Sequence, residues 1–180
     1  VGTSHVGTSN EQLLVACCTV SGEWNWVREL GGSGPEFGYG AVIQPNGTVM
    51  AVGYTKSFAD HRQMFLGLIE QDGTVLSASA VSTAGDDWEA RSIAPKPDGN
   101  YVMAAYTLEY GAGEKDYYLM TSDPLGNIES GPTFGGGGDD EPWGVSATLD
   151  GAFYIVGTTA SYGPGASAVF LVRCVGDTLN

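Results

Sequence analysis

Three related segments decide the fold: PNGTVMAVGYT at residues 45–55, PDGNYVMAAYT at 97–107 and LDGAFYIVGTT at 149–159. Each begins with a turn, and the turn glycines Gly47, Gly99 and Gly151 are separated by 52 residues and then by 52 again. The mainly apolar residues after each glycine are typical of a β-strand. Residues 1–4 match the end of the same segment in a fourth copy. A fixed period of this length indicates a repeated structural unit.

Each period is expected to contain four strands. In the second copy these are residues 39–44, 48–55, 63–70 and 74–81. Asn-Gly and Asp-Gly between two strands favour a tight hairpin, because glycine accepts the positive φ of a primed turn. Further turn glycines follow the period, and so do Gly- and acid-rich segments at 34–37, 85–88 and 138–141; the glycines are Gly22, Gly73, Gly126 and Gly176.

Four antiparallel strands in a repeat of this size are the blade of a β-propeller. A β-sandwich is the alternative, although sandwiches seldom repeat at a fixed period. The sequence therefore predicts a single all-β domain of about four blade positions, two complete and two partial. The expected divisions are a partial blade at 1–32, blades at 33–84 and 85–135, and a partial blade at 136–180.

The two partial blades leave three interpretations open. The ring closes imperfectly, another molecule completes a partial blade by β-strand addition, or the chain is a piece of a longer propeller. The segments LVAC at 14–17 and LVRC at 171–174 are copies of one strand type, so both cannot fill the same position in one blade.

Composition narrows the class of protein. Lys and Arg total 7 against 21 Asp and Glu, which gives a net charge of −14 and argues against a nucleic-acid partner. A hydrophobic content of 42% argues against disorder. We expect no membrane span, because no apolar run approaches the roughly 20 residues that a spanning helix needs.

The repeats resemble those of secreted bacterial and archaeal β-propeller proteins. The segments that carry the resemblance are FGGGGDD at 134–140, DGAFYIVGTT at 150–159, VFLVR at 169–173 and GDTL at 176–179. The resemblance extends over almost the whole chain, although each motif is degenerate. It implies a propeller, export from the cell and a non-catalytic surface role, and it transfers no catalytic residues.

The three cysteines suggest a disulfide that would join the first and last partial blades. Cys17 and Cys18 are consecutive on a predicted strand and point to opposite faces. We therefore expect only one of them to form a disulfide with Cys174, within the chain or between subunits. The alternative is that all three are small buried hydrophobic residues.

Calcium is the only cofactor that the sequence suggests. Carboxylates next to glycine-rich backbone could bind it, and the candidates are Asp86, Asp87, Asp139, Asp140 and Glu141. The alternative is that they are solvated loop residues. Asn46 begins a glycosylation acceptor pattern, but the turn alone accounts for Asn-Gly at this place. Aromatic residues recur in phase, such as Tyr39 with Trp143, which favours packing between blades over stacking on sugars.

Catalytic motifs are scarce. His5 and His61 lie in different repeats, and no nucleophile motif or phosphate loop is present. We therefore predict a non-catalytic extracellular structural protein that self-assembles into a surface filament through its incomplete blades. An extracellular propeller module that binds glycans or a surface protein is the alternative, and a fragment of a propeller glycosidase or lyase is the third. The predicted assembly strands contain Gln12, Leu14, Val20, Trp24, Trp26, Leu30, Val169, Leu171 and Cys174.

Overall fold

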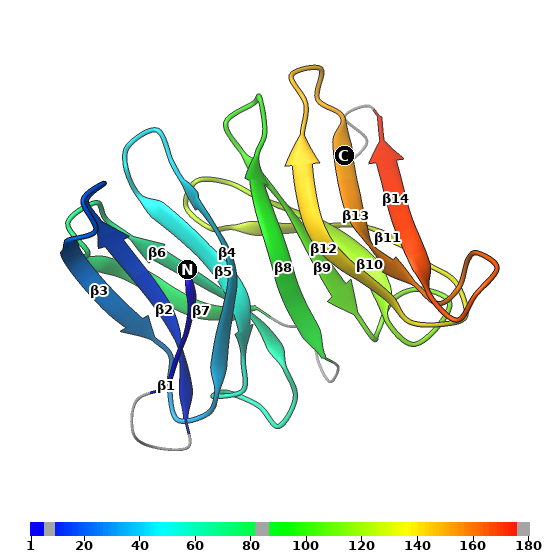
Figure 1. Cartoon of the computed structure of the whole chain (residues 1–180), viewed down its shortest axis with the longest axis horizontal. Helices are drawn as coiled ribbons and strands as arrows, with labels where there is room; N and C mark the ends of the chain where they lie inside the picture. The colour runs from blue at the N-terminus through cyan, green and yellow to red at the C-terminus, as the bar shows by residue number, and fades with distance from the viewer. Residues whose placement is uncertain (6–9, 82–86, 176–180) are drawn as a thin grey trace. The chain divides into compact units, whose positions relative to one another are not determined.

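The computed structural model describes residues 1–5, 10–81 and 87–175 (Figure 1). Within these ranges, 14 antiparallel strands form four sheets and no helix occurs. The all-β class predicted from the sequence is therefore confirmed. The same ranges contain no long apolar helix that could cross a membrane. The chain divides into two compact units, Val1–Gly85 and Asp86–Asn180.

The N-terminal unit contains two sheets in which strands adjacent in sequence pair antiparallel (Figure 1). The first sheet has the order β1-β2-β3, made of β1 (Gly2–His5), β2 (Glu11–Cys18) and β3 (Trp24–Leu30). The second has the order β4-β5-β6-β7, made of β4 (Glu36–Ile43), β5 (Val49–Thr55), β6 (Gln63–Ile69) and β7 (Val75–Val81).

The C-terminal unit has the same construction. Its four-stranded sheet consists of β8 (Trp88–Pro95), β9 (Tyr101–Thr107), β10 (Asp116–Ser122) and β11 (Ile128–Phe134). Its three-stranded sheet consists of β12 (Asp140–Ala147), β13 (Phe153–Thr159) and β14 (Ala168–Cys174).

Strand register shows which elements correspond. The pairs β4–β5, β8–β9 and β12–β13 each contain an irregularity at the fourth residue of the first strand, namely Tyr39, Arg91 and Trp143. The common phase of Tyr39 and Trp143 is therefore confirmed. Counting from these bulges, β12–β14 corresponds to β4–β6, and the described residues contain no counterpart of β7 in this sheet. By the pairing of β1 with β2, the first sheet corresponds to β5–β7, again without a counterpart of β4 among the described residues.

The turn glycines have the predicted positive φ, but the turn type differs from the prediction. Gly47, Gly99 and Gly151 have φ of 87°, 88° and 81°, whereas no described non-glycine residue has a positive φ. A type I′ turn would need positive φ at both central residues and a type II′ turn at the first of them. Instead, Gly47 N–H donates to Gln44 O at 2.9 Å and Gln44 N–H donates to Thr48 O at 2.8 Å. This pattern is a type I turn followed by a glycine bulge.

Each unit has one apolar core, formed where its two sheets face each other. Within each unit, we call the side of the earlier sheet that packs on the later one its front face, and the side of the later sheet that packs on the earlier one its back face. Residues at corresponding positions of the repeat in the other sheets are assigned to the same face. In the N-terminal unit, front-face residues Leu13 and Val15 pack on back-face residues of the second sheet, which are Ala51, Phe65 and Ile69.

The core of the C-terminal unit repeats this arrangement. The front face of β9 and β10 contributes Val102, Ala104, Tyr117 and Leu119. The back face of β13 contributes Phe153 and Ile155, and partly buried residues of β14 complete it. Front-on-back packing therefore occurs in both units.

A glycine substitution tests the turn geometry. In Gly99→Ala the new β-carbon meets no atom within 4 Å, so backbone strain at φ +88° is the main cost. We expect the free energy of unfolding to fall by about 1–2 kcal/mol, which urea denaturation would measure. Gly137→Ala is the matched control, because that site is equally open and has no positive φ. Equal losses in the two variants would contradict the turn assignment.

Candidate functional site: buried carboxylates and ion pairs between two sheets

A buried carboxylate occupies the first position of β12 and of β4. Asp140 and Glu36 are both 0% exposed. Asp140 Oδ2 accepts the N–H of Gly136 at 2.9 Å and the hydroxyl of Ser161 at 2.7 Å. Glu36 accepts the N–H of Gly32 at 3.2 Å and the hydroxyl of Ser57. In both sheets the carboxylate thus holds the preceding glycine-rich loop against the end of the next strand.

Asp116 brings a second buried carboxylate to Asp140. It is the first residue of β10 and is 1% exposed, and its Oδ2 accepts the N–H groups of Ala112 at 2.9 Å and Gly113 at 3.3 Å. A β-carbon at Gly135 would lie 1.6 Å from Asp116 Oδ1 and 2.7 Å from Asp140 Oδ2, so the two carboxyl groups approach each other at this glycine. Only glycine leaves room for both.

The electrostatics of this pair are unfavourable for two full charges. The Oδ1 atoms of Asp116 and Asp140 are buried and have no hydrogen-bond partner among the described residues. Burial raises the pKa of Asp116, the nearby charge of Asp140 raises it further, and the two backbone N–H groups oppose the shift. A carboxyl group whose pKa is raised by burial and by a like charge holds its proton more strongly than an exposed one.

The N-terminal unit has a different pair at the corresponding place. A β-carbon at Gly31 would lie 2.0 Å from Glu36 Oε2 and 2.3 Å from Gln12 Oε1. Here a neutral amide stands beside the buried carboxylate, and its Nε2 donates to the backbone oxygens of Glu11 and Gly32. Asp116 replaces that amide in the C-terminal unit, and it can donate only in its protonated form.

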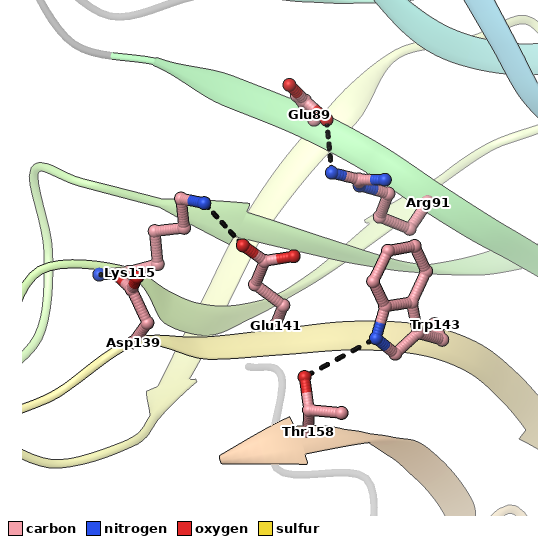
Figure 2. Close-up of polar contacts among 7 residues, drawn as sticks. All are labelled: Glu89, Arg91, Lys115, Asp139, Glu141, Trp143 and Thr158. Carbon is pink, nitrogen blue, oxygen red and sulfur yellow. Dashed lines mark hydrogen bonds and ion pairs between the residues drawn. The ribbon is translucent and has the colours of Figure 1, made fainter. Parts of the chain in front are cut away.

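Two ion pairs and the ring of Trp143 involve residues of β8 and β12 together with Lys115 and Thr158 (Figure 2). Arg91 pairs with the buried Glu89 at 2.7 Å, and Lys115 pairs with Glu141. The guanidinium of Arg91 lies 4.7 Å from the ring centroid of Trp143. Trp143 Nε1 donates to Thr158 Oγ1 at 3.4 Å (Figure 2). Each charged group thus has a partner of opposite charge, and the rings shield them from water.

The predicted calcium residues do not form one cluster. Asp86 lies outside the described residues. Asp139 is exposed and its Oδ1 accepts the N–H of Lys115 at 3.3 Å, Asp140 is buried, and Glu141 pairs with Lys115. In the described ranges, no set of three or more His, Cys, Asp or Glu side chains is arranged to hold a metal. Calcium binding stays a prediction.

No disulfide joins Cys174 to Cys17 or Cys18 within the chain, in which all three cysteines are free thiols, and a disulfide between subunits stays a prediction. Cys174 packs against the core of the C-terminal unit, where burial raises the pKa of its thiol. Cys17 and Cys18 lie in the first sheet, in the other unit. Each thiol is fixed in the sheet of its own unit, and sequence spacing gave no information about that.

Asn46 has a structural role in its turn. Its Oδ1 accepts the N–H of Thr48 at 3.0 Å, which is the hydrogen bond that an Asn in a turn forms with the backbone two residues further along the chain. The side chain is exposed, and glycosylation there stays a prediction.

The predicted assembly residues have different environments. Gln12 and Leu14 lie on β2 and are half-buried, and Val20 lies beyond the end of β2, in the turn that follows, where it is exposed. On β3, Leu30 belongs to the core, and Trp26 is half-buried with its Nε1 donating to Gln71 O at 2.9 Å. The exposed members on strands are Trp24 (68%), Val169 (78%) and Leu171 (60%).

An apolar cavity of about 500 Å³ lies in the N-terminal unit. Residues of β2 and of β4 form part of its lining, together with Trp26 and Gln71. Trp26 and Arg28 already direct their polar atoms to backbone oxygens of Gln71 and Gly73. The cavity is therefore poor in free donors for a sugar.

Comparisons with known proteins give similarity to solved structures and none at the level of sequence families. No family model and no curated protein matches the sequence. The chain is similar to a crystal structure of a protein of unknown function from Bacteroides caccae, with 14% sequence identity and a TM-score of 0.49. The match covers 81% of this chain and 47% of the other, so this chain spans about half the length of that protein.

The variant Asp116→Asn tests whether Asp116 is strained by its charge. Because its pKa is raised in the folded state, the free energy of unfolding should be highest below the ordinary pKa of Asp and fall as the pH rises through the raised value. An Asn amide carries no charge and can donate to Asp140, whereas the Asp116 carboxylate cannot. We expect the variant to be more stable than the wild type by about 1 kcal/mol at pH 8, with the gain vanishing toward pH 4.

Asp98→Asn is the matched control for this measurement. A hydrogen bond from Lys96 lowers the pKa of Asp98, so its carboxylate favours the folded state above the ordinary pKa of Asp. Its replacement should therefore lower stability at pH 8 and have little effect near pH 3, the opposite trend. Urea denaturation across this pH range measures both. An Asp116→Asn variant that is less stable than the wild type at pH 8 would show that a charged Asp116 is well accommodated.

Proposed function

We propose that this protein is a non-catalytic structural module of an extracellular or cell-surface assembly, built as a β-propeller and associating with copies of itself through its two three-stranded sheets. The observation that carries the proposal is the exposed apolar surface of β12–β14. Val169 is 78% exposed, Leu171 60% and Val156 42%. Apolar side chains gathered on one sheet face mark an interaction site.

The packing inside each unit supports a propeller. In the C-terminal unit, β12 lies against β8 and β9 and has only slight contact with β10. In the N-terminal unit, β4 lies against β1 and β2. Neighbouring blades of a propeller are likewise closest at their first strands, near the central channel, and diverge toward the outer strands.

The use of the buried polar groups supports a non-catalytic role. Asp140 Oδ2 and the Glu36 carboxylate accept hydrogen bonds from loop N–H groups and hydroxyls of their own unit. Lys115 and Arg91 are paired with Glu141 and Glu89. These contacts hold loops and strands together, and the buried carboxylate recurs at the first position of β4 and β12, as a structural group does.

Composition and resemblance support the extracellular location. The repeats resemble those of secreted propeller proteins, and 7 Lys and Arg in 180 residues leave few sites for proteases that cleave after basic residues. Glycine, present 28 times, is concentrated in the turns and loops that connect strands.

A module that binds a glycan or a surface protein is the second candidate. Trp24, on the back face of the first sheet, is the observation that favours it, because its ring is 68% exposed and could stack on a sugar. Trp143 gives it less support, because Arg91 covers one face of its ring and Thr158 binds its indole N–H. A glycan array would detect such binding, and Trp24→Ala should abolish any true hit.

Sedimentation velocity over a wide concentration range tests self-association. We expect a weight-average sedimentation coefficient that rises with concentration, because each chain carries exposed apolar sheet surface that a second chain can cover. Negative-stain microscopy at the highest concentration should then show linear particles. A single monomeric species at every concentration would contradict the proposal.

A further inference from the structure

The two uncovered sheet faces of the chain are of complementary type. The first sheet packs its front face on the second sheet, so its back face is left uncovered within the N-terminal unit. The last sheet packs its back face on β8–β11, so its front face is left uncovered within the C-terminal unit. The chain thus carries one back face and one front face that its own units do not use.

Corresponding residues show what the front face of the last sheet is suited to contact. Val156, Val169 and Leu171 occupy the positions that Ala104, Tyr117 and Leu119 occupy in β8–β11. Those three residues are 0–1% exposed because the back face of β12–β14 covers them. Their counterparts on β13 and β14 are 42–78% exposed.

The N-terminal unit shows the same relation. Leu13 and Val15 of β2 correspond to Val169 and Leu171 of β14, and they are 0% and 4% exposed under the back face of the second sheet. In both units, the front-face residues at these positions are covered by the back face of the other sheet of that unit.

The back face of the first sheet has the matching character. Leu14, Ala16 and Cys18 lie on it together with Val27 and Trp24, as the register of β2 with β3 shows. The corresponding residues of the last sheet are Phe170, Val172 and Cys174. Those residues lie on its back face and pack on the front face of β8–β11. Trp24 is 68% and Val27 43% exposed.

We propose that the front face of β12–β14 docks on the back face of β1–β3 of a second copy of this chain. This inference rests on the self-association proposed above and names its surface. The contact continues the front-on-back packing already present within each unit, and it joins two different surfaces. Such a heterologous contact propagates head to tail unless a ring closes.

The docking involves whole faces and exchanges no strand. The last sheet has the strand types of β4–β6 and the first sheet those of β5–β7, so joining them edge to edge would give six strands with two types duplicated. Stacking leaves both sheets as they are. Exposed side chains alternate with half-buried ones along β14, so the exposed Val169 and Leu171 lie on the same side of the strand.

Two blocking variants test the contact. Leu171→Glu puts a charge on the front face, and Trp24→Glu puts one on the back face; both sites are exposed, so we expect the fold to be kept, as circular dichroism and thermal melting would show. Each variant should raise the dissociation constant about tenfold or more, the effect of removing a central apolar contact. Leu125→Glu, at a turn residue that is 77% exposed, is the control and should associate like the wild type.

Mixing the two variants distinguishes head-to-tail docking from other contacts. Leu171→Glu keeps an intact back face and Trp24→Glu an intact front face. We expect each alone to be monomeric and an equimolar mixture to form a one-to-one dimer that does not grow further, as sedimentation velocity would record. Two monomeric variants that do not combine would overturn the head-to-tail arrangement.

A cysteine at Ser146 provides a direct readout of the contact. Ser146 is exposed on the front face beside Tyr154, and it corresponds to Ala94, which lies in the core cluster that Cys174 packs against. Cys18 corresponds to Cys174. Under mild oxidation, Ser146→Cys should form covalent dimers and longer chains with Cys18 of a second copy, and the further change Cys18→Ser should abolish them.

The outcomes separate this inference from the function on which it rests. Self-association that both blocking variants leave unchanged, or that gives no disulfide in Ser146→Cys, would overturn the docking surface while self-association stands. A wild-type chain that is monomeric throughout would overturn both, including the case in which the chain covers its own front face.

Discussion

Apolar residues on both faces of each sheet are the constraint on which this structure depends. Every residue of β9 and β10 is buried, so these strands have cover on both sides. β13 and β14 have sequences that are apolar on both faces as well, FYIVGTT and AVFLVRC, yet in them buried or half-buried residues largely alternate with exposed ones. A sheet with two apolar faces cannot cover both against a single neighbour, so the packing of two sheets within one unit leaves a second apolar face on each of them to be covered.

The repeat made much of the fold predictable from sequence. Its period located the hairpins, and the turn glycines have the positive φ expected of them. The turn type was missed, although the sequence contained the signal. Pro45 and Pro97 occupy the first central position of their turns, and the proline ring fixes φ near −65°, which a primed turn cannot accept. The finer proposal, closure into a propeller, depends on how the sheets are arranged around an axis, and hydrophobic pattern carries little information about that.

The buried carboxylates were harder to find than the fold. Sequence reasoning grouped Asp139, Asp140 and Glu141 because they are adjacent, but alternation along a strand sends neighbouring side chains to opposite faces. Asp140 instead meets Asp116, 24 residues earlier in the chain. The reason is that β11 pairs antiparallel with β10 and therefore ends beside the start of β10, from where a short loop leads to Asp140 at the start of β12. The available signal was comparison between repeats. The glycine that separates the pair recurs as Gly31, where Gln12 and Glu36 meet.

The same comparison explains why one pair carries strain and the other does not. Gln12 carries no charge, so it places no like charge beside the buried Glu36. Asp116 carries a charge unless it is protonated, and burial opposes two charges at one glycine. A change of one side chain between otherwise equivalent junctions thus makes the C-terminal junction sensitive to pH through Asp116. Since both junctions join a front face to a back face, a stack built from them would contain a titratable contact at regular intervals.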